Sequence, residues 1–581
     1  MTPFWQSYPS QPAPQPDWQR AARLFRTCRS WWLGAMVGWA VPFALLASPG
    51  RAAEEVYLSF GLLERSISFS ALETFAKEGR ITAELRPYTR LLSQAQRDQL
   101  QTVLNNRVEL GPVAISQFLY SDQGEVLLQR FGEVVQTESF RPGAQGLRAA
   151  LVLAAADPEG ITPLNVLRQF PLRAVRIDVN QAARLASQLE TLIRQTQQAV
   201  DAIALQAAEN TTFQLTPDYN RLPDLQEAGP YLWQKQTILL NDDTRDRVFL
   251  ADVYLPITAT GAPLDAPAPT VVISHGLGSN RDTFAYLATH LASYGMVVAV
   301  PEHPGSNTEQ LDALVSGRAS QVIDPAEFID RPLDIRYLLD RLQVLSQTDQ
   351  LFLNRVDVDR TGVLGQSLGG YTAIALAGAS LNLNQLGNEC RANNIFNLSL
   401  LLQCRVLETP NAQSLNFRDE RVKAIFTINP LGSSLLDQTD LAAINIPIVI
   451  AAGSADTITP ALIEQIQPFT RLTATDRYLL LMENGTHFSS IDVPKTDNVT
   501  FSLPTEAVGP DPAIAHSYLR PLSLSFFGAH LANEPSLKPY LTSAYANYLS
   551  QPALPIYWLG SFTADQLAAA LLAQTSNNRI E

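Results

Sequence analysis

The second half of the chain alternates short β-branched runs with helical segments, and this alternation restricts it to a layered α/β fold. Eight runs have the length and the Val, Ile and Thr content of buried strands: 233–240, 247–255, 270–274, 296–300, 361–364, 422–428, 446–451 and 477–482. Helical patterns fall between several of them, at 283–293, 331–347, 368–379 and 460–468. Helical crossovers predict a mostly parallel sheet, while the first two runs, with no helix between them, predict an antiparallel start. We therefore expect an α/β domain with an eight-stranded, mostly parallel sheet over residues 233–575.

Residues 54–209 carry mainly helical patterns. Apolar residues recur at three- and four-residue steps at 70–76 and 91–104, and 181–205 is predicted to form one long amphipathic helix. A polar, proline-containing stretch at 210–232 predicts a linker. We expect a mainly helical N-terminal domain, in which no nucleophile, base and acid are grouped.

Residues 1–53 have the three parts of a secretory signal. Four arginines precede an uncharged apolar run at 31–46, and small residues follow at 47–53. The apolar run is only slightly shorter than a membrane span, so an uncleaved anchor is an alternative, and a buried or amphipathic helix is another. We expect export to the periplasm or the cell exterior, with membrane association through this segment if it is not cleaved.

Charge and cysteine content exclude several classes of function. The formal net charge of −14 at pH 7 argues against nucleic-acid binding through the overall field. Beyond the leader the chain has only Cys390 and Cys404, whose spacing allows a disulfide in an oxidising compartment and equally allows two buried or free thiols. Neither these cysteines nor the six histidines show metal-ligand spacing, so no metal or organic cofactor is implied.

A glycine-framed serine lies between a predicted strand and a predicted helix. The stretch GQSLG at 365–369 follows the run 361–364 and precedes the helical pattern at 368–379. The motif alone is weak support, but strand, sharp turn and helix are what a nucleophile elbow requires. The glycines permit close approach of strand and helix, and the helix start directs free N–H groups toward a developing oxyanion. Ser367 is thus the candidate nucleophile, and an ordinary polar turn residue is the alternative.

A nucleophilic serine needs a base and a third group that orients the base. The candidate base is His487, because it directly follows the predicted strand 477–482. His516 and His530 also follow Ser367 in the chain, but no predicted strand precedes either of them. A structural histidine is the alternative for His487.

The candidate acid is Asp456, which lies just after the run 446–451 and before a predicted helix. A carboxylate there can accept a hydrogen bond from the imidazole and fix its tautomer. Asp437 is the main rival, although it lies several residues beyond the preceding predicted strand. A helix N-cap is the alternative role for Asp456.

The loop after the third predicted strand is the expected second half of an oxyanion hole. Its Gly276 and Gly278 let the backbone approach a substrate. The backbone N–H of Leu277 is then expected to act together with that of Leu368. His275 precedes the nucleophile, so we expect it to brace this loop by hydrogen bonds.

Two stretches around this loop carry a specific resemblance. SHGLGSNR at 274–281, followed by LASYGMVVAVPEH at 291–303, is similar to the platelet-activating-factor acetylhydrolase group and the related dienelactone-hydrolase-like esterases. The resemblance covers residues 233–490 and implies an α/β-hydrolase fold. Residues from 54 to about 210 resemble an uncharacterised domain that precedes such hydrolases in photosynthetic bacteria, for which no activity is implied.

The resemblance also implies roles for the candidate residues: Ser367 as nucleophile, Asp456 as acid and His487 as base. The expected activity is hydrolysis of a small-molecule or lipid ester through an acyl-enzyme, without a cofactor. A catalytically inert envelope binding protein, or an amidase or thioesterase on the same fold, are the alternatives.

The chain departs from the pattern of this group at a few places. Gln366 stands where the group more usually has histidine before the serine, and His303 is followed by proline rather than a basic residue. Two long insertions, 381–421 and 493–521, interrupt the α/β alternation, and we expect them to form lids or substrate walls.

Overall fold

The computed structural model describes residues 53–573, apart from 62, 91, 214–216, 392–395, 410–415 and 493–507. These described residues belong to one compact unit. Residues 1–52 of the predicted leader lie outside them, as does most of the second predicted insertion. No helix within the described ranges has the length and apolar character needed to cross a membrane.

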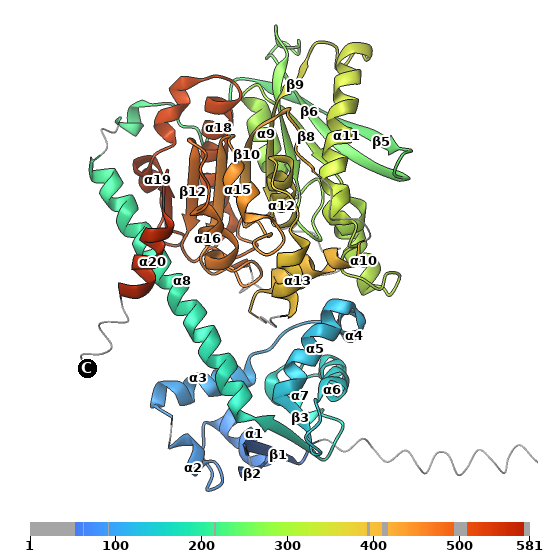
Figure 1. Cartoon of the computed structure of the whole chain (residues 1–581), viewed down its shortest axis with the longest axis vertical. Coiled ribbons are helices and arrows are strands. Elements are labelled where there is room, and N and C mark those ends of the chain that lie inside the picture. The colour runs from blue at the N-terminus through green and yellow to red at the C-terminus, as the bar shows by residue number, and fades with distance from the viewer. Residues whose placement is uncertain are drawn as a thin grey trace, which may run out of the picture. The chain divides into compact units, whose positions relative to one another are not determined.

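Among the described residues, nine strands form one large sheet (Figure 1). In chain order they are β5 (Leu232–Asp242), β6 (Arg247–Ile257), β7 (Ala268–Ser274), β8 (Val297–Pro301), β9 (Val356–Gln366), β10 (Val422–Ile428), β11 (Ile448–Gly453), β12 (Arg477–Met482) and β13 (Ile556–Leu559). Across the sheet their order is β13-β12-β11-β10-β9-β7-β8-β6-β5. From β12 to β8 all neighbours are parallel, whereas β5, β6 and β13 each pair antiparallel with a neighbour.

The mostly parallel sheet and its antiparallel start are confirmed, but the predicted count of eight strands is wrong. The ninth strand is β13, which pairs antiparallel with β12 and forms the edge of the sheet. Its four residues are too few to show a clear alternation in the sequence. Its Trp558 is buried in the core, and that burial depends on contacts with distant parts of the chain.

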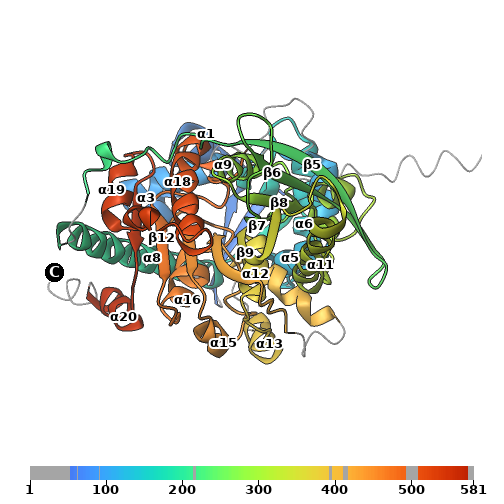
Figure 2. The ribbon, with the colours of Figure 1, turned by 90° about the horizontal axis from the view of Figure 1, so that it is seen from above.

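Helices cover both faces of this sheet, because successive strand residues point to opposite sides. In β7, Val271 and Ile273 belong to one buried cluster and Val272 to the other. The first cluster packs on α9 (Ala285–Ser293), α18 (Pro512–His530) and α19 (Ser543–Leu549). The second packs on α8 (Val179–Phe213), α11 (Glu327–Thr348), α12 (Leu368–Leu376) and α20 (Ala564–Ala573). Figure 2 shows the strands between these two sets of helices.

Short elements connect these layers at the ends of the strands. They are η2 (Pro304–Ser306), α10 (Thr308–Val315), α13 (Leu383–Arg391), α14 (Leu398–Gln403), η3 (Cys404–Glu408), α15 (Gln438–Ala443), the π-helix η5 (Leu462–Ile466), α16 (Gln467–Phe469) and η6 (Pro535–Tyr540). The first predicted insertion, 381–421, therefore contains α13, α14 and η3.

The N-terminal part of the described chain is mostly helical and has its own buried cluster. Its helices are α1 (Phe69–Glu78), α2 (Arg86–Thr89), α3 (Gln94–Asn105), α4 (Pro112–Tyr120), α5 (Asp122–Val134), α6 (Ala144–Ala156) and α7 (Pro163–Arg168). A small sheet accompanies them, with β1 (Glu55–Phe60), β2 (Leu63–Ser68), β3 (Val135–Thr137) and β4 (Ala174–Asp178). Its order is β2-β1-β4-β3, and no sequence pattern predicted it.

The long helix α8 joins this part to the large sheet. Its residues Ala199, Val200 and Ile203 are buried in the same cluster as α11 and α12. Near its end, the amide of Gln206 donates a hydrogen bond of 2.9 Å to the carbonyl oxygen of Ser561. The C-terminal half of α8 therefore packs as part of the large α/β structure.

Candidate active site

Ser367 lies in a strained turn between β9 and α12. Its φ of 56° and ψ of −117° are unusual for a residue with a side chain. A Cβ atom on Gly365 would come within 2.0 Å of the Gly369 carbonyl oxygen, and one on Gly369 within 2.0 Å of the Ser274 carbonyl oxygen. Both flanking positions therefore require glycine, and the structure forms the sharp elbow that the motif predicts.

The structure brings Ser367, His487 and Asp456 together, although they follow three different strands. The Oγ of Ser367 lies 3.0 Å from Nε2 of His487, and Nδ1 of His487 lies 2.7 Å from Oδ2 of Asp456. All three residues are at most 5% exposed. Because the carboxylate binds one ring nitrogen, the other can accept the serine proton.

Two family models match parts of this chain. Residues 246–311 match the model of the platelet-activating factor acetylhydrolase, isoform II, family. Residues 52–178 match a family described as alpha/beta hydrolase of unknown function (DUF1400). The chain has an α/β-hydrolase fold. In this chain the second match falls on the helical N-terminal part and not on the large sheet, and no curated protein matches the hydrolase significantly.

Thr459 supports the acid of this hydrolase, and sequence reasoning missed it. Its hydroxyl donates a hydrogen bond of 2.7 Å to Oδ2 of Asp456, and it also lies 3.2 Å from Nδ1 of His487. The other carboxylate oxygen accepts hydrogen bonds from the backbone N–H groups of Ile458 and Thr459, at 2.8 and 2.7 Å. Asp456 therefore has the N-cap-like backbone contacts of its alternative role and contacts His487 as well. The signal in the sequence was the Asp-x-x-Thr spacing.

The rival residues do not contact Ser367. Asp437 caps α15 by accepting hydrogen bonds from the backbone N–H groups of Thr439 and Asp440. His516 stacks on Tyr286 with 3.7 Å between ring centroids, and burial lowers the pKa of its imidazole. The side chain of His530 packs against aromatic residues of α18 and β12.

The backbone N–H groups of Leu277 and Leu368 donate no hydrogen bond to any described residue. The N–H of Ser367, in contrast, is bonded to the carbonyl oxygen of Ile428, 2.9 Å away. Leu368 is the first residue of α12, so its N–H is one of the unpaired groups at the helix start. Both groups are thus free to act as donors beside the serine.

The peptide unit that carries the Leu277 N–H is fixed by a hydrogen bond to its carbonyl oxygen. Nδ1 of His275 lies 2.8 Å from the carbonyl oxygen of Gly276, which belongs to the same peptide unit. Because this unit is planar and trans, its N–H points away from that carbonyl oxygen. His275 is fully buried, and its Nε2 accepts a hydrogen bond of 3.1 Å from the backbone of His303. It braces the loop in the way the sequence suggested.

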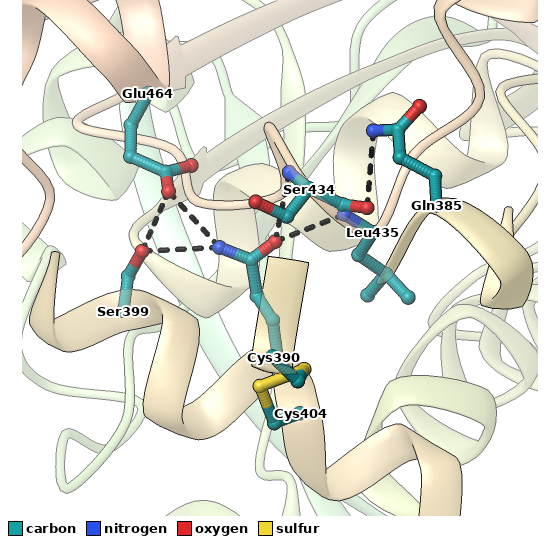
Figure 3. The surroundings of a disulfide bond; sticks show 8 residues. Gln385, Cys390, Ser399, Cys404, Ser434, Leu435 and Glu464 are labelled. Atoms are coloured by element: carbon teal, nitrogen blue, oxygen red, sulfur yellow. Dashed lines mark hydrogen bonds between the residues drawn. A yellow bond between two sulfur atoms is a disulfide. The ribbon is translucent and has the colours of Figure 1, made fainter. Parts of the chain in front are cut away.

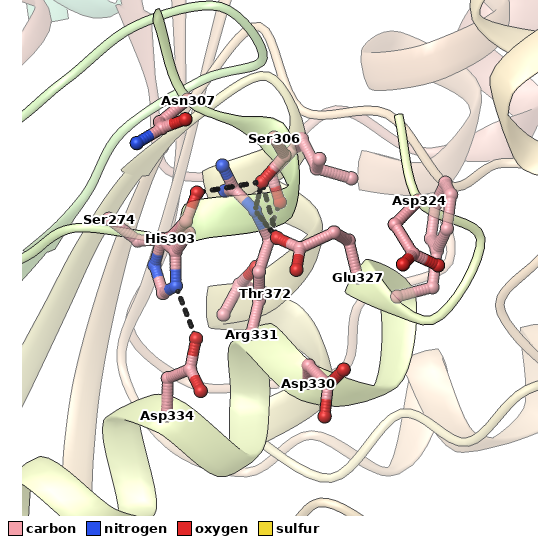
Figure 4. Close-up of polar contacts among 12 residues, drawn as sticks. Ser274, His303, Ser306, Asn307, Asp324, Glu327, Asp330, Arg331, Asp334 and Thr372 are labelled. Atoms are coloured by element: carbon pink, nitrogen blue, oxygen red, sulfur yellow. Dashed lines mark hydrogen bonds and ion pairs between the residues drawn. The ribbon is translucent and has the colours of Figure 1, made fainter. Parts of the chain in front are cut away.

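A buried network beneath the loop was not predicted (Figure 4). The guanidinium of Arg331 donates to the His275 carbonyl oxygen at 2.7 Å and to Ser306 Oγ at 2.8 Å. It also pairs with Glu327, while His303 contacts Asp334 at 2.9 Å. Burial lowers the pKa of Arg331 to about 10, so the side chain stays charged at neutral pH.

Gln366, which replaces the more usual histidine, contacts the loop of the candidate base. Its amide nitrogen lies 3.2 Å from the backbone carbonyl oxygen of His487. Asn429, directly after β10, adds two contacts: its Nδ2 donates to the Thr486 carbonyl oxygen at 3.2 Å, and its Oδ1 accepts from the Gly453 N–H at 2.9 Å. The end of β11 and the loop after β12 are therefore tied together.

A cavity of about 300 Å³ opens beside Ser367 and His487. Its other lining residues are Phe118, Gln123, Leu127, Leu277, Ser279, Val322, Gln366, Leu398, Leu401, Leu402, Ile458, Phe488 and Ile491. None of them is an aspartate, glutamate, lysine or arginine, and most are apolar. Such a cavity suits the apolar part of a ligand.

One wall of the cavity is the helix α14 of the first predicted insertion. Cys390 of α13 and Cys404, directly after α14, form a disulfide, with 5.9 Å between their Cα atoms. The sequence left open whether these two cysteines pair, and in the structure they are bonded. The disulfide therefore fixes the C-terminal end of α14, just after the residues of this helix that line the cavity.

A buried carboxylate holds α14 at both of its ends (Figure 3). One oxygen of Glu464 accepts hydrogen bonds from the side chains of Asn397, Ser399 and Gln403, at 2.6, 2.8 and 3.0 Å. Its other oxygen accepts two backbone N–H groups of the loop after β10, at 2.9 Å each. A carboxylate this buried is tolerated because its hydrogen bonds are satisfied, and it attaches the insertion to the sheet.

Proposed function

We propose that this hydrolase is a serine carboxylic-ester hydrolase that acts through an acyl-enzyme. One observation carries the proposal: Ser367, His487 and Asp456 form a continuous chain of contacts of 3.0 and 2.7 Å at the elbow after β9. The match to the acetylhydrolase family supports the same reaction class.

In the first half of the reaction, the Ser367 Oγ attacks the ester carbonyl carbon while Nε2 of His487 takes its proton. The carbonyl oxygen becomes an oxyanion and accepts hydrogen bonds from the N–H groups of Leu277 and Leu368. The C–O bond to the alcohol then breaks, and the His487 proton passes to the departing oxygen. Asp456 stabilises the imidazolium throughout.

In the second half, a water molecule loses a proton to His487 and attacks the acyl carbon. The bond to Ser367 breaks, the proton returns to its Oγ, and the carboxylic acid leaves.

We propose that the ester carries an apolar acyl group and that lipid esters with short acyl chains are the preferred substrates. The described lining residues support this because none of them is charged, so an unpaired charge buried among them would lose its hydration without compensation. If the substrate is a phospholipid, its charged headgroup lies outside the cavity.

We also propose that the hydrolase is exported, with membrane association if the leader remains. The disulfide between Cys390 and Cys404 supports an oxidising compartment, because cytosolic thiols are kept reduced. Cell fractionation with sequencing of the mature N-terminus tests this.

Turnover of aryl esters tests the proposed reaction. Ser367→Ala removes the nucleophile, so kcat on a 4-nitrophenyl ester should fall by roughly four orders of magnitude or more. Ser523→Ala is the matched control, since this buried serine of α18 should leave kcat unchanged. Retained turnover in Ser367→Ala contradicts the proposal.

A further inference from the structure

Three side chains from the N-terminal helices line the cavity at Ser367. Phe118 comes from α4, and Gln123 and Leu127 come from α5. These helices lie within the segment that matches the family of unknown function. This segment is therefore part of the candidate active site, although the sequence grouped no catalytic residues in it.

An ion pair holds the start of α5 next to the disulfide-linked wall. Asp122 accepts a hydrogen bond of 2.5 Å from the guanidinium of Arg405, whose side chain is only 5% exposed. Ser121 caps α5 by accepting the N–H of Gly124. Gln123 thus lies in the first turn of a capped helix, next to a fixed contact with the insertion.

The amide of Gln123 is buried without a hydrogen-bond partner. The residue is 4% exposed, and neither its Nε2 nor its Oε1 is hydrogen-bonded to any described residue. An unsatisfied buried polar group is destabilising, because it has lost its hydrogen bonds to water without a replacement. A ligand that supplies a polar atom in the cavity removes this cost, whereas a purely apolar ligand does not.

We propose that Gln123 binds a neutral polar group of the substrate, so that α4 and α5 select which ester reaches Ser367. This inference rests on the proposed esterase activity. The group is a second ester, an ether or a hydroxyl, all of which offer an oxygen that accepts a hydrogen bond from the amide NH₂. It is neutral because the described residues that line the cavity include no charged side chain to pair with an ionised group. The preferred substrate is therefore an apolar ester with an additional neutral oxygen.

A pair of matched esters tests this assignment on the full-length protein. One is 4-nitrophenyl heptanoate. The other is an isosteric ester in which an ether oxygen replaces one methylene of the acyl chain, and one such ester is made for each chain position. Wild type should prefer one of the ether esters. Gln123→Leu should lower kcat/KM for that ester by about fivefold, which corresponds to the loss of one neutral hydrogen bond of about 1 kcal/mol, and should not lower it for the heptanoate.

Two further variants control for changes in folding. Gln123→Met keeps the unbranched shape and should shift the ratio of the two kcat/KM values in the same direction. Gln129→Leu changes an exposed glutamine of the same helix and should leave the ratio at the wild-type value. If wild type prefers no ether position, or if both Gln123 variants keep the wild-type ratio, the proposal is overturned.

Labelling of Ser367 by a fluorophosphonate separates this proposal from the proposed function. If wild type and Gln123→Leu are both labelled and the ratio does not change, the role of Gln123 is wrong and the esterase assignment stands. If wild type is neither labelled nor active on any of the esters, the esterase assignment fails, and the role of Gln123 fails with it.

Discussion

Arg331 donates a hydrogen bond of 2.7 Å to the carbonyl oxygen of His275, and its guanidinium also lies 3.5 Å from the carbonyl oxygen of Gly276. These carbonyls belong to the two peptide units that lead to the Leu277 N–H. The fully buried guanidinium therefore fixes the backbone of the proposed oxyanion loop. This role is one of positioning, because Arg331 lies behind the loop and not in the cavity.

Arg331→Lys should lower kcat by about 10- to 100-fold with little change in KM. Lysine keeps the positive charge but lacks the planar guanidinium, whose several N–H donors have a fixed geometry. A misplaced oxyanion donor affects mainly the transition state, so kcat falls while KM changes little. Kinetics on an aryl ester measure the effect. Arg245→Lys is the control, because Arg245 pairs with Asp334 in the same network without touching the loop. An equal loss of kcat in both variants contradicts a specific role for Arg331.

Thr459→Val should lower kcat by about tenfold without loss of folding. The variant keeps the side-chain shape but removes the hydroxyl that holds Asp456 Oδ2, and hydrogen bonds to charged groups are worth about 1.5–3 kcal/mol. The kcat of the variant and its dependence on pH are the measurements. Thr427→Val, which removes a hydroxyl from the buried sheet, should leave kcat unchanged. If kcat of Thr459→Val is unaltered, the prediction is wrong, because Asp456 then functions without the hydrogen bond from the Thr459 hydroxyl.

Replacing both Cys390 and Cys404 by serine should lower the thermal midpoint and raise KM for longer acyl esters. Closing a loop of about 15 residues contributes about 3 kcal/mol in the chain-entropy account, and the bond fixes a cavity wall. Hydrolysis of an acetyl ester should change little. A reducing agent should have the same effects on wild type and none on the double variant. The assignment of α14 to the substrate wall is wrong if KM is unaffected for every acyl length.

Acid should destabilise the fold through His290, which is buried in α9. Burial, with help from Arg520, lowers the pKa of this imidazole to about 4. In the unfolded chain the pKa of this histidine is about 6.5, so between pH 6.5 and pH 4 the unfolded chain binds more protons than the folded protein. The contribution of His290 to the free energy of unfolding is therefore complete above pH 6.5 and is lost as the pH falls toward 4. The loss from His290 alone amounts to about 3 kcal/mol by pH 4.

His290→Gln removes this titration. Urea unfolding of the variant should therefore depend less on pH between 6.5 and 4 than unfolding of wild type. Identical pH dependence in both proteins means that His290 is not the group that titrates.

The local patterns predicted most of the large sheet. Strands such as β9 and the helix after it show their period and their glycines within a short window, so the elbow at Ser367 could be located from sequence. The order of the later strands also favoured His487 as the base and Asp456, over its rival Asp437, as the acid.

What the sequence did not reveal depends on contacts between distant segments. The amide of Gln123 reaches the cavity only because α5 packs beside the insertion, and nothing near it in the sequence marks it as part of a site. Arg331 lies in an amphipathic helix where a charged residue is ordinarily solvated. The small sheet of β1 to β4 was missed because its outer strands are short and its middle pair joins the two ends of the N-terminal segment.

Covalent labelling tests the central claim most directly. The full-length protein is incubated with a fluorophosphonate, and the modified peptide is identified by mass spectrometry. The account predicts a single adduct on Ser367, no adduct in Ser367→Ala, and labelling slowed by at least about 100-fold in His487→Ala. An adduct on another residue, or labelling of Ser367 at the same rate without His487, would contradict it.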